Sequence, residues 1–185
     1  IVTLALGIGA NTAVFTVLHA VLVRPLPYPE AGRLVRIWES NPEKGMPRFS
    51  ASPRNLVDWR ERARSFSQLA AYVDDRVTLT GDAGAERIQG ESATPELFPL
   101  LGVSPLLGRP FRVEEGKPGA DAVVILSETL WRTRFGADPG ILGRTLNLSG
   151  TARTVVGVMP ASFRFPSATT ALWMPLAFDE RDLGN

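Results

Sequence analysis

Residues 121–160 read DAVVILSETLWRTRFGADPGILGRTLNLSGTARTVVGVMP, and this stretch decides the fold. It opens with five apolar residues, Ala122–Leu126, a pattern typical of a strand that is buried on both faces. Ser127 follows as a predicted N-cap, because its hydroxyl can accept a backbone N–H of the first helical turn. A short helix is then predicted to end at Gly136. One largely apolar face of this helix carries Leu130, Trp131, Arg134 and Phe135.

The second half of the stretch predicts a β-hairpin. Asp138-Pro139-Gly140 predicts a turn after the helix. Arg144–Ser149 then alternates polar and apolar residues, and Ser149-Gly150 is a turn signal. Thr154–Met159 returns as the second strand. A strand, a helix and a hairpin are therefore predicted here, and no catalytic constellation lies among them.

The composition limits the classes of function. The chain has 185 residues, enough for one or two domains with a hydrophobic core. Its net charge of +1 gives no strong field toward nucleic acid, so we expect no nucleic-acid partner. The sequence has no cysteine, which excludes disulfides, thiolate zinc sites and thiol catalysis. The one histidine, His19, lies in an apolar run, away from any partner for a Ser-His-Asp or multi-histidine site.

The first 23 residues, IVTLALGIGANTAVFTVLHAVLV, contain no charged side chain. A helix over Ile1–Val23 would be long enough to cross a bilayer core of about 30 Å, so we predict a transmembrane helix and not a removable leader. Polar Asn11 and the small residues Gly7 and Gly9 should then face partner helices. The proline-rich Arg24–Pro29 stops the helix. The alternative is a buried helix of a soluble domain.

Two segments before the middle of the chain predict a strand and a long helix. Leu34–Trp38 has the composition of a strand, and the polar segment Asn41–Ser52 predicts a loop. Ser52 and Pro53 then fit the N-cap and the first position of a helix over Pro53–Ala71. Its predicted apolar face consists of Leu56, Trp59, Ala63, Phe66 and Ala70.

Shorter elements follow. Arg76–Thr80 predicts a strand, and Glu86–Thr94, with one apolar Ile among polar residues, predicts an exposed or edge strand. Thr94 is expected to cap a brief helix over Pro95–Leu101. Leu172–Leu176 is the last predicted strand.

No residue is assigned as catalytic, cofactor-binding or metal-binding. Glu114 and Glu115 are adjacent carboxylates that could hold a cation, but a solvated turn is the favoured interpretation. Gly116-Lys117 is similar to the end of a phosphate-binding loop, yet Pro118 stands where Ser or Thr belongs. Since no nucleophile–base pair is visible, we predict that the protein is not an enzyme and needs no cofactor.

Several segments resemble MacB-like ABC-transporter permeases, and above all the acidobacterial duplicated orphan permeases of the FtsX-like permease superfamily. In chain order they are ALGIGANTAVF, LVRPLPYPE, LVRIWE, SPRNLVDWRERARSFSQLAAY, ESATPELFPLLGVSPLLGRPF, VVILSETLWRTRFGADPGILGRTLNLSG and TVVGVMPASFRFP. The resemblance covers nearly all of the chain, and this order of motifs is specific.

The resemblance implies an α+β fold, with an N-terminal transmembrane helix (1–23) and a two-lobed extracytoplasmic domain. Residues 24–102 would form the first half of a porter-like α/β lobe, and 103–166 an inserted small mixed α/β lobe. Residues 167–185 would return toward the porter-like lobe. The family's later part does not appear, so we expect the chain to be a fragment of a longer permease.

The resemblance also implies a transport role in the bacterial inner membrane. A separate cytoplasmic ABC ATPase subunit would drive the membrane helices, and this domain would pass the motion outward for export or efflux. A second permease copy and membrane lipid are further expected partners. The residues expected to pack the membrane helix or to hold the lobes are Gly7, Gly9, Asn11, Trp59, Phe66, Trp131 and Phe135.

Two other classes of function stay open at this point. One is an extracytoplasmic sensor that binds a ligand or a partner protein, with Glu86–Thr94 as an edge for strand addition. The other is a hydrolase, which the lack of a visible nucleophile–base pair disfavours.

Overall fold

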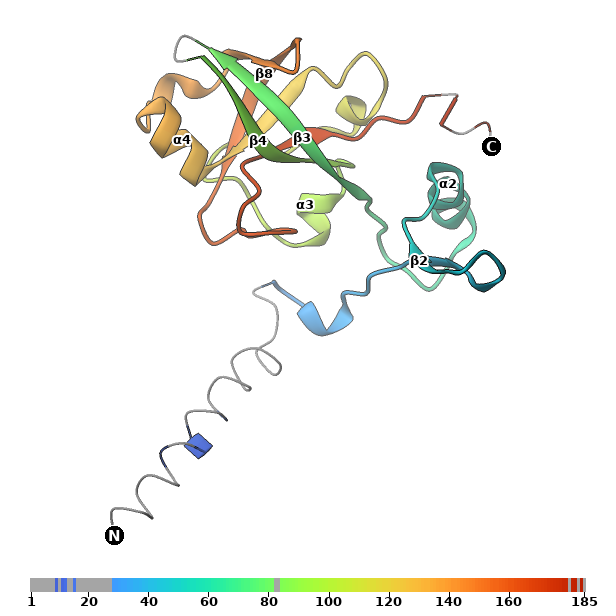
Figure 1. The fold of residues 1–185 in the computed structure, drawn as a ribbon. Coiled ribbons are helices and arrows are strands. Elements are labelled where there is room, and N and C mark those ends of the chain that lie inside the picture. The colour runs from blue at the N-terminus through green and yellow to red at the C-terminus, as the bar shows by residue number, and fades with distance from the viewer. Residues whose placement is uncertain are drawn as a thin grey trace. The chain divides into compact units, whose positions relative to one another are not determined.

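The structure is a computed structural model that describes residues 9, 11, 12, 15, 28–81, 84–179, 181, 182 and 184 (Figure 1). The chain divides into two units, Ile1–Arg36 and Ile37–Asn185. In the first unit, the 3₁₀ helix η2 covers Ala31–Arg33. The predicted transmembrane helix Ile1–Val23 lies outside the described residues, apart from four helical positions. Within the described part of the chain, no helix is long and apolar enough to cross a membrane.

The second unit begins with a small β-hairpin, in which β1 (Glu39–Asn41) pairs antiparallel with β2 (Met46–Phe49). The predicted strand over Leu34–Trp38 is wrong, because these residues form no regular element and β1 starts after them. The predicted loop over Asn41–Ser52 is wrong in part, since it contains β2 and the 3₁₀ helix η3 (Pro42–Lys44). The composition of a strand is not enough for one to form, because a ladder also needs a partner at the right register.

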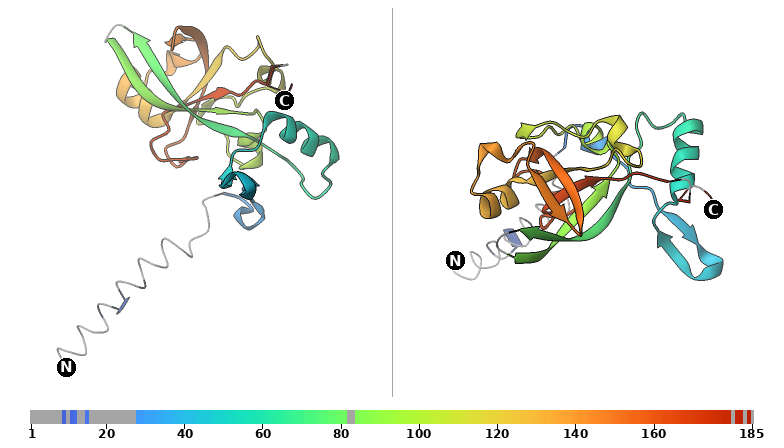
Figure 2. Two further views of the ribbon diagram at one scale, coloured as in Figure 1. Left: turned by 45° about the vertical axis from the view of Figure 1, so that its right-hand side comes forward. Right: turned by 90° about the horizontal axis from the view of Figure 1, so that it is seen from above.

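Helix α2 (Pro53–Arg62) begins as predicted but ends early. The hydroxyl of Ser52 accepts the backbone N–H of Asn55 at 3.2 Å, which confirms the predicted N-cap. After Arg62 the backbone becomes extended, so the predicted helix over Pro53–Ala71 is wrong at its C-terminal end. Figure 2 shows α2 and the β1–β2 hairpin beside the larger sheet of this unit.

Seven strands form one sheet that closes on itself. Its order is β5-β8-β6-β9-β4-β3-β7, and β7 also pairs with β8, which completes a ring of six strands with β5 added to β8. The pairs β4–β9 and β6–β8 are parallel, and the other pairs are antiparallel. The strands are β3 (Tyr72–Gly81), β4 (Gly84–Ala93), β5 (Leu107–Gly108), β6 (Val123–Ser127), β7 (Thr145–Leu148), β8 (Thr151–Met159) and β9 (Leu172–Pro175).

The stretch that decides the fold has the predicted elements. β6 is followed directly by α4 (Glu128–Phe135), and the Ser127 hydroxyl accepts the backbone N–H of Leu130 at 3.1 Å. Gly136 ends the helix in the left-handed conformation, with φ of 61°. A 3₁₀ helix, η5 (Pro139–Ile141), then leads into the β7–β8 hairpin. β8 starts three residues before its predicted first residue, Thr154, because its pairing with β7 continues to the turn.

The two faces of the strands pack into two separate cores. One face forms an aliphatic core, which α4 covers with Leu130 and Trp131. Its strand residues are Val77, Leu79, Ile88, Val124, Leu126, Leu146, Leu148, Val155, Val158, Leu172 and Met174. The other face carries a cluster of aromatic rings, Phe98, Phe111, Phe163 and Trp173, whose neighbouring centroids lie 5.1–6.2 Å apart. Phe98 belongs to helix α3 (Leu97–Leu100), which lies in the connection from β4 to β5.

β4 lies inside the sheet, between β3 and β9, so the predicted exposed or edge strand Glu86–Thr94 is wrong. The polar residues hid this position, because only Glu86 and Arg87 lie at its exposed start, whereas Glu91 and Thr94 are buried. The sheet draws strands from each of the ranges 24–102, 103–166 and 167–185. The division into lobes at Val103 stays a prediction.

Candidate functional site

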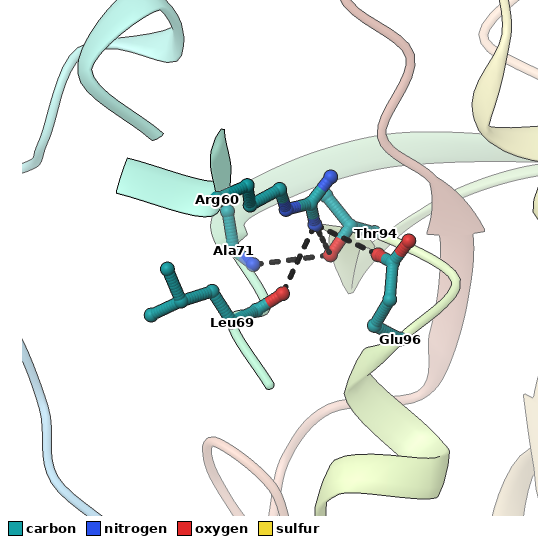
Figure 3. A network of polar contacts seen from close by, with 5 residues as sticks. All are labelled: Arg60, Leu69, Ala71, Thr94 and Glu96. Atoms are coloured by element: carbon teal, nitrogen blue, oxygen red, sulfur yellow. Dashed lines mark hydrogen bonds and ion pairs between the residues drawn. The ribbon is translucent and has the colours of Figure 1, made fainter. Parts of the chain in front are cut away.

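Arg60, in the last turn of α2, forms a polar network that ties this helix to the sheet (Figure 3). Its Nη2 donates to the backbone carbonyl of Leu69 at 3.1 Å and to Oγ1 of Thr94 at 3.3 Å. The same nitrogen lies 2.8 Å from Oε2 of Glu96. The Arg60 and Glu96 side chains are each about one-third exposed, so water weakens this ion pair and its main effect is to fix geometry.

Thr94 is the buried centre of this network. Its Oγ1 accepts the backbone N–H of Ala71 at 3.1 Å, and its own N–H donates to the carbonyl of Ala71 at 2.9 Å. The prediction that Thr94 caps the next helix is wrong, because its hydroxyl is used by Ala71 and Arg60; the N-cap position of α3 is Glu96. These bonds also explain the early end of α2. The chain must turn back after Arg62, because the Leu69 carbonyl accepts a hydrogen bond from the Arg60 guanidinium.

An open hollow of about 220 Å³ lies against this network. Its apolar lining comes from Trp59, Ala63, Phe66 and Leu69, and Arg60 and Glu96 lie at the same hollow. Ser67 and Gln68 complete the lining of the hollow. Phe66 is 39% exposed and Trp59 is half-buried. That these two residues hold the lobes stays a prediction.

Glu115, in the 3₁₀ helix η4 (Val113–Gly116), is not part of a solvated turn. Its two carboxylate oxygens accept from the two terminal nitrogens of Arg109, at 2.9 and 2.5 Å, and Oε2 also accepts the backbone N–H of Arg112 at 2.7 Å. Burial acts to raise the pKa of Glu115, but the bonds from Arg109 and Arg112 outweigh it and hold the pKa below its ordinary value. Because Arg109 occupies both oxygens, the interpretation is corrected for Glu115, which forms a partly buried ion pair. Glu114 is exposed, as the solvated turn predicts.

The other residues singled out in the sequence have separate locations. Trp131 is buried in the aliphatic core, as predicted, and Phe135 packs against this core. Gly7 lies outside the described residues, whereas Gly9 and Asn11 are helical and exposed. Among the residues that the structure describes, no group of three or more His, Asp or Glu side chains could hold a metal ion.

The hydrogen-bonding roles of Arg60 and Thr94 were not predicted from the sequence. Arg60 is one of several arginines on α2, and nothing in the sequence separates it from its solvated neighbours. Its role depends on a chain reversal between α2 and β3 that has no glycine or proline to mark it.

Comparison with known proteins gives the family. The profile of the MacB-like periplasmic core domain matches residues 1–184. The chain belongs to this family. No curated protein sequence matches it. As a MacB-like periplasmic core domain, it is part of the ABC-transporter permease family, and this family context places such domains outside the cytoplasm.

Solved structures share the fold of this MacB-like domain. The periplasmic region of MacB from Actinobacillus actinomycetemcomitans has a TM-score of 0.59 and 14% identity, over 76% of this chain and 63% of that one. The extracellular domain of the noncanonic ABC-type transporter YknZ from Gram-positive bacteria has a TM-score of 0.58 and 16% identity, over 76% and 71%. A permease domain from Porphyromonas gingivalis has a TM-score of 0.54 and 22% identity, over 75% and 64%. The chain thus spans less than two-thirds of the first and third structures, and these identities establish the fold alone.

Proposed function

We propose that this chain is the extracytoplasmic domain of a permease whose membrane helices are driven by a separate cytoplasmic ABC ATPase. In this role it couples the movement of those helices to export or efflux of a substrate, without catalysing a reaction itself. The family match over residues 1–184 carries the proposal. A second permease copy and membrane lipid are the further proposed partners, and Ile1–Val23 is the proposed transmembrane helix of the plasma membrane.

The Arg60 network supports a coupling role. Arg60 lies 34 residues before Thr94 and 36 residues before Glu96, and it connects α2 to the end of β4 and to the start of α3. A movement of α2 is therefore passed to the sheet through direct hydrogen bonds and not through a flexible linker. The ion pair contributes little free energy at this exposure, so its role here is positional.

The first test is a pull-down of the full-length permease that contains this domain. Recruitment of an ABC ATPase supports the proposal. Recovery of a soluble ligand or partner, without an ATPase, contradicts it and favours the sensor. The structure also weakens the sensor alternative, because β4 lies inside the sheet and offers no free edge for strand addition.

The second test addresses coupling. Hydrogen exchange of residues 72–93 is measured in the assembled transporter, with and without a non-hydrolysable ATP analogue. The nucleotide should change the exchange in the wild type and in Arg62→Ala, an exposed matched control on the same helix. Arg60→Ala should lose this change while still recruiting the ATPase. If both variants respond alike, the network does not transmit the movement.

A further inference from the structure

Glu91 is a buried carboxyl group in the middle of the sheet. It lies on β4, directly opposite Asp74 of β3 and beside Trp173 of β9 in the strand register. Its exposed fraction is 1%, whereas Asp74, at the margin of the same face, is exposed. A lone carboxylate at this depth has a high desolvation cost, so its surroundings decide its charge.

Two buried polar atoms at this position form no hydrogen bond of normal geometry among the described residues. They are Oε2 of Glu91 and Oγ1 of Thr170, which is itself 5% exposed and precedes β9. Buried polar atoms are normally hydrogen-bonded, and unpartnered ones call for an explanation. Thr170 is close enough to influence the pKa of Glu91, so both atoms belong to one site.

The charged groups around Glu91 do not include a buried cation. On the same face of β3, the titratable residues are Tyr72, Asp74 and Arg76, and Arg76 is exposed. On β4 the same face carries Gln89 and, nearer the start of the strand, Arg87, which is exposed. β9 carries no titratable side chain, and the segment 160–171 carries only Arg164, which is exposed. Burial raises the pKa of Glu91 to about 7, helped by the charge and hydrogen bond of Asp74, while Gln89 and Thr170 act in the opposite direction.

We propose that Glu91 and Asp74 share one proton, and that this proton controls how tightly residues 167–170 pack on the sheet. With the proton bound, the Glu91 hydroxyl donates to the Asp74 carboxylate, and the pair carries one negative charge. When the proton leaves to solvent, two adjacent carboxylates repel each other, and one of them is fully buried. The segment that holds Thr170 then loosens, which gives water access to the Glu91 carboxylate.

Within this segment, Ser167–Thr169 is suited to this movement, because the residues on either side of it hold the segment to the rest of the domain. After Thr170, the N–H of Ala171 donates to the Gln89 carbonyl at 2.8 Å. Earlier in the segment, the Phe165 carbonyl accepts from Trp173 Nε1 at 3.1 Å. Between these points, Ser167–Thr169 is exposed. The Ser167 hydroxyl bonds to the Thr169 hydroxyl at 2.8 Å and accepts the Thr169 N–H at 3.2 Å, so these bonds lie within the segment itself. Loosening of Ser167–Thr169 disturbs neither the aliphatic core nor the aromatic cluster.

The test is hydrogen exchange of residues 167–172 in the full chain from pH 5 to pH 9, corrected for the intrinsic exchange rate. Wild-type protection should fall several-fold as the pH rises through about 7. Glu91→Gln keeps the shape of the protonated acid, so its protection should not change with pH. Glu86→Gln, at an exposed position of the same strand, should behave as the wild type. A titration of the Glu91 carboxyl carbon by NMR gives the midpoint directly.

Asp74→Asn is a second, surface variant that keeps Glu91. This variant should move the midpoint of the pH-dependent loss of protection to lower pH, because the neighbouring negative charge is gone. The proposal is overturned if wild-type protection is independent of pH, or if Glu91→Gln retains the wild-type dependence. It is also overturned if added Ca²⁺ or Na⁺ restores protection above pH 7 in the wild type but not in Glu91→Gln, since the site would then bind a metal cation.

Discussion

Replacing Trp131 by alanine should strongly destabilise the sheet. The Trp131 side chain is only 8% exposed and packs in the aliphatic core beside Leu130 and Ile141. Its indole Nε1 also donates to the Asp138 carbonyl at 2.8 Å, which fixes the start of η5. Removing a buried aromatic ring costs about 3–5 kcal/mol, and the hydrogen bond accounts for about 1 kcal/mol of this. Trp131→Phe should therefore lose about 1–2 kcal/mol, because it keeps most of the apolar contact but not the bond.

Urea unfolding followed by circular dichroism measures these free energies in the full chain. Trp38→Ala is the matched control, because the Trp38 side chain is 39% exposed, and it should cost less than half as much. Equal losses for Trp131→Ala and Trp38→Ala would refute the assignment of Trp131 to the core. A loss for Trp131→Phe as large as that for alanine would mean that the hydrogen bond, and not the packing, stabilises this helix.

Three further substitutions test local features. Gly108→Ala should lower the melting temperature much more than Gly119→Ala. Both glycines have positive φ, but a Cβ atom on residue 108 would lie 2.2 Å from the Val156 carbonyl oxygen. A Cβ atom on residue 119 would have no atom within 4 Å. Ser127→Ala should cost about 1 kcal/mol of unfolding free energy, because α4 loses its N-cap. Glu115→Gln should be less stable than the wild type at pH 7 but approach it in acid. The folded pKa of Glu115 lies below its unfolded value, so its stabilisation is present above the unfolded pKa and is lost as the pH falls through the folded one. Melting curves from pH 3 to pH 7 check this, and parallel curves for both proteins would contradict it.

Local signals in the sequence predicted local structure well. Ser127 and Gly136 mark the ends of α4, and Ser149-Gly150 marks the β7–β8 turn, where both residues have positive φ. Each of these signals acts within a few residues, through a cap or a turn whose chemistry the sequence states. The elements between residues 121 and 160 are therefore confirmed almost in full.

Features that depend on distant partners were not predictable from the sequence. Glu86–Thr94 has the polarity of an edge strand, but pairing with β9, far along the chain, places it inside the sheet. Leu34–Trp38 has the composition of a strand and forms none. The polar contacts could not be predicted for the same reason. Arg60 reaches Glu96, and Glu91 faces Thr170, only after the sheet has closed.

The central claim is that this is an extracytoplasmic domain of a membrane permease. The sequence has no cysteine, so a single introduced cysteine reports one position without background from the chain. Ala120→Cys lies in an exposed loop, and Val124→Cys, fully buried in β6, serves as the control for folding. In intact cells that express the full-length permease, a sulfonated maleimide that does not cross the plasma membrane should label Ala120→Cys and leave Val124→Cys unlabelled. Labelling of Ala120→Cys only after the plasma membrane is permeabilised would place the domain in the cytoplasm and contradict the claim.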